Sequence, residues 1–444
     1  MTSILGISAF YHDSAAALII DGKIVAAAQE ERFTRKKHDP SYPRNAINFV
    51  LNFAKLKLNQ IDHIIFYEKP LLKFERLLET YLSFAPKGFK SFSMSMPLWI
   101  KDKLFQKKFL FNELKKIDDN FNDINKIYFS EHHFSHAASA YYPSPFKDAT
   151  ILTLDGVGEW ATTTISEGKN ENLKIIKEIN FPHSIGLLYS AFTYYTGFKV
   201  NSGEYKLMGL APYGKPIYKN EIKEKLIDIK DDGTFKLDMT FFKYHRGFRM
   251  TSKKFHKLFG SPPRDAEEEL TQFHMDLASS IQSVTEEIVM KIANSLRKET
   301  GIKNICMAGG VALNCVANGK LLEENFFDDM WIQPASGDAG SALGAALVCW
   351  YEHFNKSRKV NPNDSMKGTY LGCNFSNGEI VNYLKQINAP FESNPDEELF
   401  EKIALELDKG KIIGWFNGPM EFGPRALGGR SIIGDPRNKD MQSV

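Results

Sequence analysis

The chain has 444 residues, 43% of them hydrophobic and 25% charged, which is enough to bury the cores of two or three domains. Its 56 lysines and arginines against 54 acidic residues give a formal charge of only +2, so the composition indicates neither nucleic acid nor a membrane as a partner. The sequence contains no apolar run long enough to cross a bilayer, no basic start typical of a signal peptide, and four cysteines without a CxxC pair. We therefore expect a cytoplasmic protein with reduced cysteines.

Two stretches share one pattern of strand, polar turn and strand. Residues 4–30 predict three strands, with a polar turn at 11–14. Residues 150–169 repeat the pattern, with an acidic, glycine-containing turn at 155–159 and a second turn at 167–169. The repetition indicates an internal duplication, although two unrelated hairpins would look the same. A duplicated α/β fold with such turns is the layout of the actin-like and sugar-kinase ATPases, where the turns face a nucleotide's phosphates.

Helices are expected to fill much of the region between these two stretches. Residues 43–57 predict an amphipathic helix and residues 61–67 a strand. Residues 70–116, rich in aromatic residues and methionine, predict a helical insertion that covers the core or shapes a pocket. The lysines within 87–127 are interleaved with Asp and Glu, so we interpret them as a solvent-exposed helical face.

A pair of histidines is a candidate metal site. His132 and His136 lie four residues apart, so on a helix they share one face and can reach one cation. Ser130 is a candidate cap for that helix, and His133 lies about a third of a turn away, which makes it a poor third ligand. A zincin protease would need Glu in place of His133, so protease chemistry is disfavoured. The alternative is a helix whose histidines are buried and hydrogen-bonded.

The second half of the chain carries two glycine-rich connections that lead into helices. Beyond a charged insertion expected at 215–265, a buried strand leads into Gly309-Gly310-Val311-Ala312-Leu313-Asn314. A glycine pair between a strand and a helix is a nucleotide-contact geometry, although many α/β connections use glycine there. Asp338 begins the next helix, where it is either an N-cap or the carboxylate that completes the site of His132 and His136.

The composition changes after residue 360. Residues 361–365 predict a linker, and the region beyond it contains Gly423-Pro424-Arg425-Ala426-Leu427-Gly428, followed by Arg430. Two arginines in a glycine-rich turn suit an anionic ligand, because guanidinium groups match the geometry of phosphate.

Taken together, these motifs resemble those of the O-carbamoyltransferases of the nodulation-protein-U and cephamycin carbamoyltransferase (NodU/CmcH) family. The resemblance spans nearly the whole chain in the family's order, through the following motifs: Tyr11-His12-Asp13-Ser14-Ala15-Ala16, residues 30–38, the helix with His132 and His136, residues 206–211, 309–314, Gly337-Asp338 and 423–428.

The resemblance and the duplication together imply a duplicated actin-like ATPase (RNase H-like) α/β fold over residues 1–360. Its halves would cover approximately 1–149 and 150–360, with helical insertions at 70–116 and 215–265. Residues 361–444 would form a linker and the beginning of a YrdC-like α/β domain. Members of the family continue well past this point, so we expect either a fragment or a chain that cannot make its own carbamoyl adenylate but transfers a carbamoyl group from supplied carbamoyl adenylate.

In that family the YrdC-like part makes carbamoyl adenylate from carbamoyl phosphate and ATP, and the N-terminal part moves the carbamoyl group to an acceptor hydroxyl. The resemblance implies a small-molecule acceptor such as a sugar, an antibiotic or another secondary metabolite. It also implies Fe²⁺ or another divalent transition metal on His132, His136 and Asp338, a set that suits such a metal on general grounds. His12 resembles the base for the acceptor hydroxyl. The implied contacts to carbamoyl adenylate are Lys37, Asp155, Gly309, Gly310 and Asn314, and the implied contact to carbamoyl phosphate is Arg425.

Two other functions remain open at this point. The first is a tRNA threonylcarbamoyl transferase-like enzyme, which the near-neutral charge and the attached second domain disfavour. The second is a non-catalytic, nucleotide-gated binding module on the actin-like fold, which would have no need of the histidine pair. The sequence also leaves open whether the chain forms a homodimer.

Overall fold

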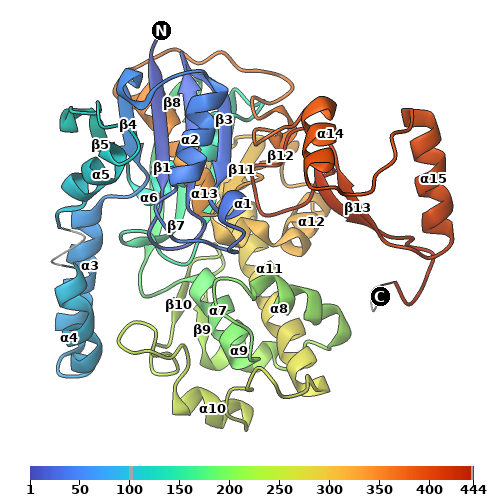
Figure 1. Ribbon diagram of the computed structural model, residues 1–444. Helices are drawn as coiled ribbons and strands as arrows, with labels where there is room; N and C mark the ends of the chain where they lie inside the picture. The colour runs from blue at the N-terminus through green and yellow to red at the C-terminus, as the bar shows by residue number, and fades with distance from the viewer. Residues whose placement is uncertain (100–103, 442–443) are drawn as a thin grey trace.

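The computed structural model describes residues 1–99, 104–441 and 444, and it is built around two five-stranded sheets (Figure 1). The strands of the first sheet lie in the order β3–β2–β1–β4–β5. They are β1 (Ser3–Ser8), β2 (Ala15–Ile20), β3 (Lys23–Gln29), β4 (His63–Phe66) and β5 (Ile127–Phe129). β2 is antiparallel to β1 and β3, whereas β4 and β5 run parallel to β1. β1 and β2 are buried along almost their whole length, which explains their nearly continuous apolar sequences.

The second sheet repeats the topology of the first. Its order is β8–β7–β6–β11–β12, from β6 (Asp148–Leu154), β7 (Ala161–Lys169), β8 (Asn172–Asn180), β11 (Asn304–Ala308) and β12 (Asp329–Ile332). Again the middle strand of the hairpins, β7, is antiparallel to β6 and β8, and both β11 and β12 run parallel to β6. Two sheets with the same strand order and directions confirm the predicted duplication and the RNase H-like, actin-like fold class.

Two helices form the layer between the sheets. α13 (Asp338–Val348) packs against β1, β2 and β4 of the first sheet, and α6 (His132–Tyr141) packs against β6, β7 and β11 of the second. The two helices pack against each other, and a side chain at Gly344 of α13 would overlap the carbonyl oxygen of Ser135 in α6. This close crossing brings the N-terminal residues of α6 and α13 together, which is where the candidate site lies.

Further helices cover the outer faces of the sheets. α1 (Glu31–Thr34) and α2 (Arg44–Phe53) pack on β3. On the second sheet, α7 (Ile185–Tyr195), α8 (Glu204–Leu210), α9 (Lys219–Lys225) and α12 (Cys315–Glu323) pack around the long α11 (Gln272–Thr300). Among the described residues, no helix is both long and apolar enough to cross a membrane.

The two expected insertions differ in structure. The described residues of 70–116 form α3 (Pro70–Phe84), α4 (Phe89–Leu98) and α5 (Gln106–Lys115), and α3 and α4 run together along one edge of the molecule (Figure 1). The segment 215–265 is not purely helical as predicted. Besides α9 and α10 (Lys253–Phe259), it contains a two-stranded sheet of β9 (Ile227–Ile229) and β10 (Phe235–Leu237), because a turn at residues 231–233 joins two short stretches that alternate buried and polar residues.

The C-terminal part contains α14 (Asn377–Gln386), α15 (Asp396–Asp408), β13 (Ile413–Phe416) and β14 (Arg430–Ile433). It stands to one side of the double-sheet body, with α15 farthest out (Figure 1). Neither α14 nor α15 has a buried residue.

Two local predictions are wrong. Residues 167–169 continue β7 instead of forming a turn, because Gly168 leaves room for the ring of Tyr141, which a side chain there would overlap. Ser130 does not cap α6, whose first N–H, that of His132, donates instead to both carboxylate oxygens of Glu159 at 3.0 Å. A carboxylate from a distant part of the chain satisfies the helix start in place of a local hydroxyl.

Candidate functional site

Four buried side chains meet where α6, α13 and the end of β6 converge. His132, His136, Asp155 and Asp338 each offer a ligand atom within 4.8 Å of the others, and we refer to them as the His/Asp cluster. The Nε2 atoms of His132 and His136 are 3.1 Å apart. The Oδ1 atom of Asp338 lies 3.6 Å from both of these nitrogens, and the Oδ2 atom of Asp155 lies 3.1 Å from His132 and 3.8 Å from His136.

Surrounding groups hold these side chains in the orientation that a cation would need. Ser341 Oγ lies 3.0 Å from Nδ1 of His136, which leaves Nε2 facing the cluster. Tyr67 donates to the outer oxygen of Asp338 at 3.4 Å, and the N–H of Gly310 donates to the outer oxygen of Asp155 at 3.0 Å. One oxygen of each carboxylate is thus bound from outside while the other points at the histidines. Such outer hydrogen bonds are typical of protein metal sites.

Opposite charges within the cluster shift the pKa values of Asp155, Asp338 and His132 toward their charged forms. Burial would raise the pKa of Asp155, but the hydrogen bond with His132 and the charge of His136 hold it well below its ordinary value. Burial would likewise raise the pKa of Asp338, whereas His12 and His132 lower it. Burial lowers the pKa of His132, but Asp155 and Asp338 outweigh it and raise the value to about 9. His133 differs from His132, because burial and the charge of His132 lower the pKa of His133 well below the ordinary value.

The donor set fits a divalent transition metal. Two imidazole nitrogens and two carboxylate oxygens converge in a buried space, and two histidines with a carboxylate are the usual set for non-haem iron and related ions. The sequence predicted His132, His136 and Asp338 for this role, and the structure brings all three together. The fourth member, Asp155, was predicted only as a contact to carbamoyl adenylate. The acidic turn that follows β6 was the signal, and its position beside α6 became visible only in the fold.

A cavity of about 410 Å³ adjoins the cluster and collects most of the other predicted residues. Its walls come from both halves of the chain and from the C-terminal part. Of the predicted residues, the following line it: His12, Lys37, Asp155, Gly310, Asn314 and Arg425. The wall also contains polar side chains to which the sequence assigned no individual role, among them Tyr11, Asp13, His38, Asn201 and Glu204.

His12 lies between the cavity and the cluster. Its Nε2 atom is 3.9 Å from Oδ2 of Asp338, and its Nδ1 atom is 2.8 Å from Oδ2 of Asp13. The other oxygen of Asp13 is 2.8 Å from Nδ1 of His38, so one carboxylate links two imidazoles. Burial would raise the pKa of Asp13, but the bonds with His12 and His38 lower it below its ordinary value. Asp13 is therefore ionised and accepts the Nδ1–H of His12, which leaves Nε2 to act on a ligand.

The two predicted phosphate contacts reach the cavity from opposite sides. Lys37 comes from the segment after α1, with its ammonium 3.4 Å from the hydroxyl of Tyr205 and 4.5 Å from the centre of that ring. Arg425 comes from the C-terminal part and donates to the carbonyl oxygen of Leu313 at 3.0 Å. Neither cation has an acidic partner within 4.0 Å among the described residues, so both are available for an anion.

Two predicted contacts also have structural tasks. The side chain of Asn314 exchanges hydrogen bonds of 2.9 and 3.0 Å with Gln282 and caps α12 through the N–H of Ala317. Gly309 does not line the cavity but has a φ of +89°, and a side chain there would overlap the carbonyl oxygen of Leu154. Its conformation allows the chain to turn sharply from β11 toward Gly310.

A duplicated RNase H-like fold with a buried His/Asp cluster beside a cavity defines this chain as an actin-like protein with a candidate metal centre. Comparison with known families narrows the class further. Residues 3–347 match the family described as carbamoyltransferase N-terminus, and residues 404–444 match that described as carbamoyltransferase C-terminus. The chain therefore belongs to the carbamoyltransferase family, a family of enzymes, as the motifs predicted.

Three relatives match most of the chain. The chain is 58% identical over its whole length to an uncharacterized protein of Synechocystis (sll1178). It is 35% identical to nodulation protein NolNO of Sinorhizobium fredii over 97% of the chain, and 35% identical to nodulation protein NolO of Bradyrhizobium diazoefficiens over 70% of the chain. The chain spans 73%, 60% and 54% of the lengths of these three relatives.

Solved structures with a similar arrangement are more distant. Component A of the (R)-2-hydroxyglutaryl-CoA dehydratase of Acidaminococcus fermentans is 16% identical, with a TM-score of 0.39 over 79% of this chain and 99% of that one. HypF of T. kodakarensis is 14% identical, with a TM-score of 0.39 over 80% of this chain and 48% of that one.

Proposed function

We propose that this chain transfers a carbamoyl group from carbamoyl adenylate to a hydroxyl of a small-molecule acceptor, the donor being made from carbamoyl phosphate and ATP. One observation carries the proposal: a single cavity is lined by the imidazole of His12, by Asp155 of the His/Asp cluster and by two cations, Lys37 and Arg425. Within the described residues, neither cation forms an ion pair. Family membership supplies the group that is transferred, and the cavity supplies a base, anion-binding groups and a candidate metal centre in one place.

His12 is the proposed base. The acceptor oxygen attacks the carbamoyl carbon, a new C–O bond forms, and the bond from that carbon to the adenylate phosphate oxygen breaks to release AMP. The acceptor proton passes to Nε2 of His12, which Asp13 orients from the other side of the ring. Burial lowers the pKa of His12, whereas Asp338 and Asp13 raise it to about 9. A cation on Asp338 would offset that negative charge and favour the neutral imidazole that a base requires.

His132, His136, Asp155 and Asp338 are the proposed holders of a divalent cation. When bound, it would stabilise negative charge on the phosphate of the leaving AMP. The identity of the ion, Fe²⁺ or another transition metal, belongs to the proposal. Lys37 and Arg425 would bind donor phosphate groups, and the backbone at Gly310 lets those groups approach closely. Cavity walls from both halves would exclude water, which protects the adenylate from hydrolysis.

The two alternative functions make different use of the same features. A tRNA threonylcarbamoyl transferase-like enzyme would bind tRNA with strong salt dependence. A nucleotide-gated binding module would bind nucleotide without consuming it. Neither has an observation of its own in this structure, whereas the base, the cation holders and the anion contacts around one cavity all support carbamoyl transfer.

The test supplies carbamoyl adenylate to the purified chain with a panel of polyhydroxyl compounds and measures acceptor-dependent release of AMP. We expect release with at least one class of acceptor, and its loss in His12→Asn. The matched control is His353→Asn, because His353 is exposed and does not line the cavity. AMP release that no acceptor stimulates, or that His12→Asn leaves intact, would contradict the proposal.

A further inference from the structure

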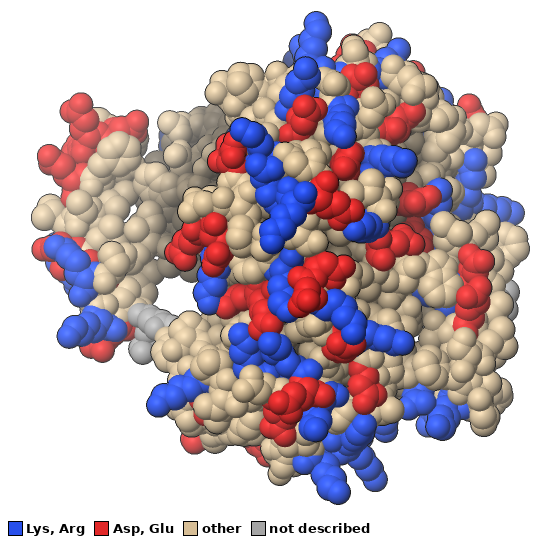
Figure 2. Space-filling model, turned by 180° about the vertical axis from the view of Figure 1, so that it is seen from behind, with Lys and Arg blue, Asp and Glu red and all other residues tan. Residues whose placement is uncertain are grey.

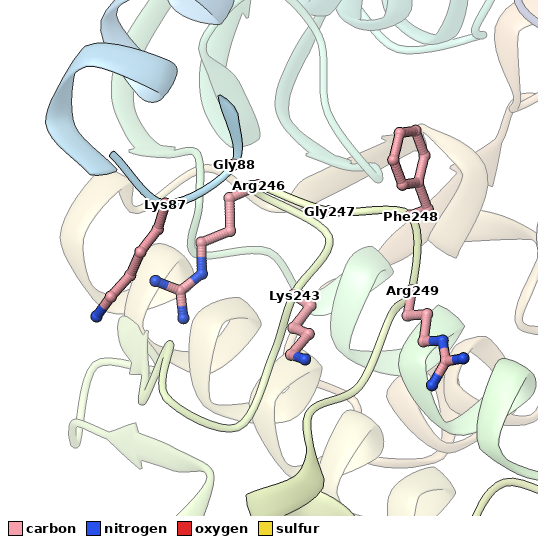
Figure 3. Close-up of a pocket in the computed structure, with 7 residues that line it drawn as sticks. All are labelled: Lys87, Gly88, Lys243, Arg246, Gly247, Phe248 and Arg249. Atoms are coloured by element: carbon pink, nitrogen blue, oxygen red, sulfur yellow. The ribbon is translucent and has the colours of Figure 1, made fainter. Parts of the chain in front are cut away.

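A second cavity, of about 450 Å³, lies between the turn that joins α3 to α4 and the loop of residues 243–249 (Figure 3). It is separate from the cavity that contains His12, and it shares no lining residue with it. Four of its lining residues are cationic: Lys87 from the turn, and Lys243, Arg246 and Arg249 from the loop. Figure 3 shows their charged ends extending to one side of the loop, whereas Phe248 points to the other side. We refer to this feature as the basic cavity.

The charge of the basic cavity is not balanced by acidic groups. Residues 80–99 and 239–264, the segments that form it, contain no Asp or Glu at all. Within the described part of the chain, none of the four cations has a carboxylate within 4.0 Å. Lys and Arg side chains also gather along the lower edge of the molecule in Figure 2, where α10 lies in Figure 1. The two segments together therefore form a region of positive charge without acidic residues of their own, although the whole chain is near neutral.

The two segments are held together by specific packing. The rings of Phe84 and His245 have centroids 4.4 Å apart, and the guanidinium of Arg246 lies 5.6 Å from the ring centre of Phe84. Gly88 has a φ of +91°, and a Cβ atom there would lie 2.9 Å from the carbonyl oxygen of Arg246. The close approach therefore depends on glycine. The cations project from a fixed junction between two parts of the fold, which lowers the entropic cost of binding a ligand.

Four unopposed charges indicate the charge of the ligand. A phosphate group carries about −1.5 to −2 charges near neutral pH, so two of them would balance the four cations. The two arginines present planar forks that suit phosphate oxygens, and the lysines add mobile point charges. Gly88 also caps the N-terminus of α4, where free backbone N–H groups favour an anion.

We propose that the basic cavity binds a ligand carrying two or more phosphate groups. This site is distinct from the proposed carbamoyl-transfer cavity and does not depend on it. The same chemistry occurs in free multivalent phosphates and in the head groups of lipids that carry two phosphate groups, and the experiment below separates these two sources.

The first measurement is calorimetric titration of the chain with sodium tripolyphosphate at low salt. Removal of two cations in the double variant Arg246→Gln/Arg249→Gln should weaken binding at least about tenfold, because two charge-assisted contacts to phosphate are lost. The matched control Lys174→Gln/Lys385→Gln removes two exposed lysines of β8 and α14, and it should bind as the wild type does. Thermal unfolding of both variants verifies that they are folded, and Lys87→Gln provides a milder second test of the cavity.

The second measurement is flotation with phosphatidylcholine vesicles that contain cardiolipin, a lipid whose head group carries two phosphate groups, and, for comparison, with vesicles of phosphatidylcholine alone. Binding of tripolyphosphate that depends on Arg246 and Arg249 supports the site with a free phosphate ligand. Binding to the cardiolipin vesicles but not to tripolyphosphate, with the same dependence on Arg246 and Arg249, supports it with a lipid head group. If neither ligand binds, or if the cavity variant and the control are weakened equally, the basic cavity is not a phosphate site.

Discussion

Nε2 of His12 lies 3.9 Å from Oδ2 of Asp338, so the candidate base and a carboxylate of the His/Asp cluster are direct neighbours. Coulomb interaction at this distance is substantial in a buried site. Any cation held by the cluster would therefore alter the proton affinity of His12, and any change at His12 would alter the charge around the cation. Experiments on this site must measure metal content and carbamoyl transfer separately.

The first prediction concerns metal binding. His136→Ala and Asp155→Asn should each lower the affinity for a divalent transition metal by at least about tenfold, because each removes a proposed ligand. Metal per chain, measured by mass spectrometry after dialysis against Fe²⁺, Mn²⁺ or Zn²⁺, checks this. His353→Ala, an exposed histidine, is the control. Equal metal content in the wild type and in both cluster variants would show that these residues do not bind the metal. A loss in His136→Ala alone would mean that Asp155 contacts carbamoyl adenylate instead of the metal.

The second prediction separates the base from its orienting partner. His12→Asn should lower transfer by about 10²–10⁴-fold while leaving nucleotide binding intact, since only proton transfer is lost. Asp13→Asn should have a smaller effect on the same rate, because Nε2 of His12 remains present but its tautomer is no longer fixed. Rates of AMP release and nucleotide affinity are measured side by side. A rate for His12→Asn close to that of the wild type would place the proton acceptor elsewhere.

The third prediction compares two helical glycines. Gly344→Ala places a methyl group on the carbonyl of Ser135 at the crossing of α6 and α13, and we expect it to destabilise the fold by about 1–3 kcal/mol or more. Gly319→Ala in α12 meets nothing within 4 Å, and it should stabilise by about 0.5–1 kcal/mol through helix propensity. Urea unfolding of both variants checks the contrast. Similar stability for the two would mean that the helices cross less tightly than described.

The fourth prediction is a pH dependence of stability. Burial and the charge of Arg246 lower the pKa of His245 from 6.5 to about 4, so the folded chain keeps this imidazole neutral. As the pH falls from about 6.5 to 4, the unfolded chain binds a proton that the folded chain does not, and stability drops by about 1–3 kcal/mol. His245→Phe should lack this component. Unfolding curves at both ends of the range test it, with His353→Phe as the control that should retain the wild-type dependence.

Much of the fold could be predicted because its signals are local. Alternating strands with tight turns at 4–30 and 150–169 revealed the duplication, and the four-residue spacing of His132 and His136 revealed half of the cluster. Gly168 was misread because glycine marks a turn as readily as a close contact, and only the position of Tyr141 distinguishes the two.

The remainder of the site depends on contacts between distant segments. Asp155 joins the histidines through the packing of β6 beside α6, and Glu159 caps α6 from beyond that strand. His38 reaches Asp13 only because both lie in the left-handed region of backbone conformation, with φ of +56° and +51°, which few side chains adopt. No spacing rule in the sequence contains such information.

The His/Asp cluster also has a mechanical consequence. His132 and His136 follow the last strand of the first sheet, Asp155 follows the first strand of the second, and Asp338 begins the helix that packs on the first sheet. One ion shared by all four would clamp the two repeats together and close a loop of about 200 residues without a covalent bond. Loading the ion would then hold the two walls of the cavity, which come from both repeats, at a fixed separation, and a chelator would remove that constraint.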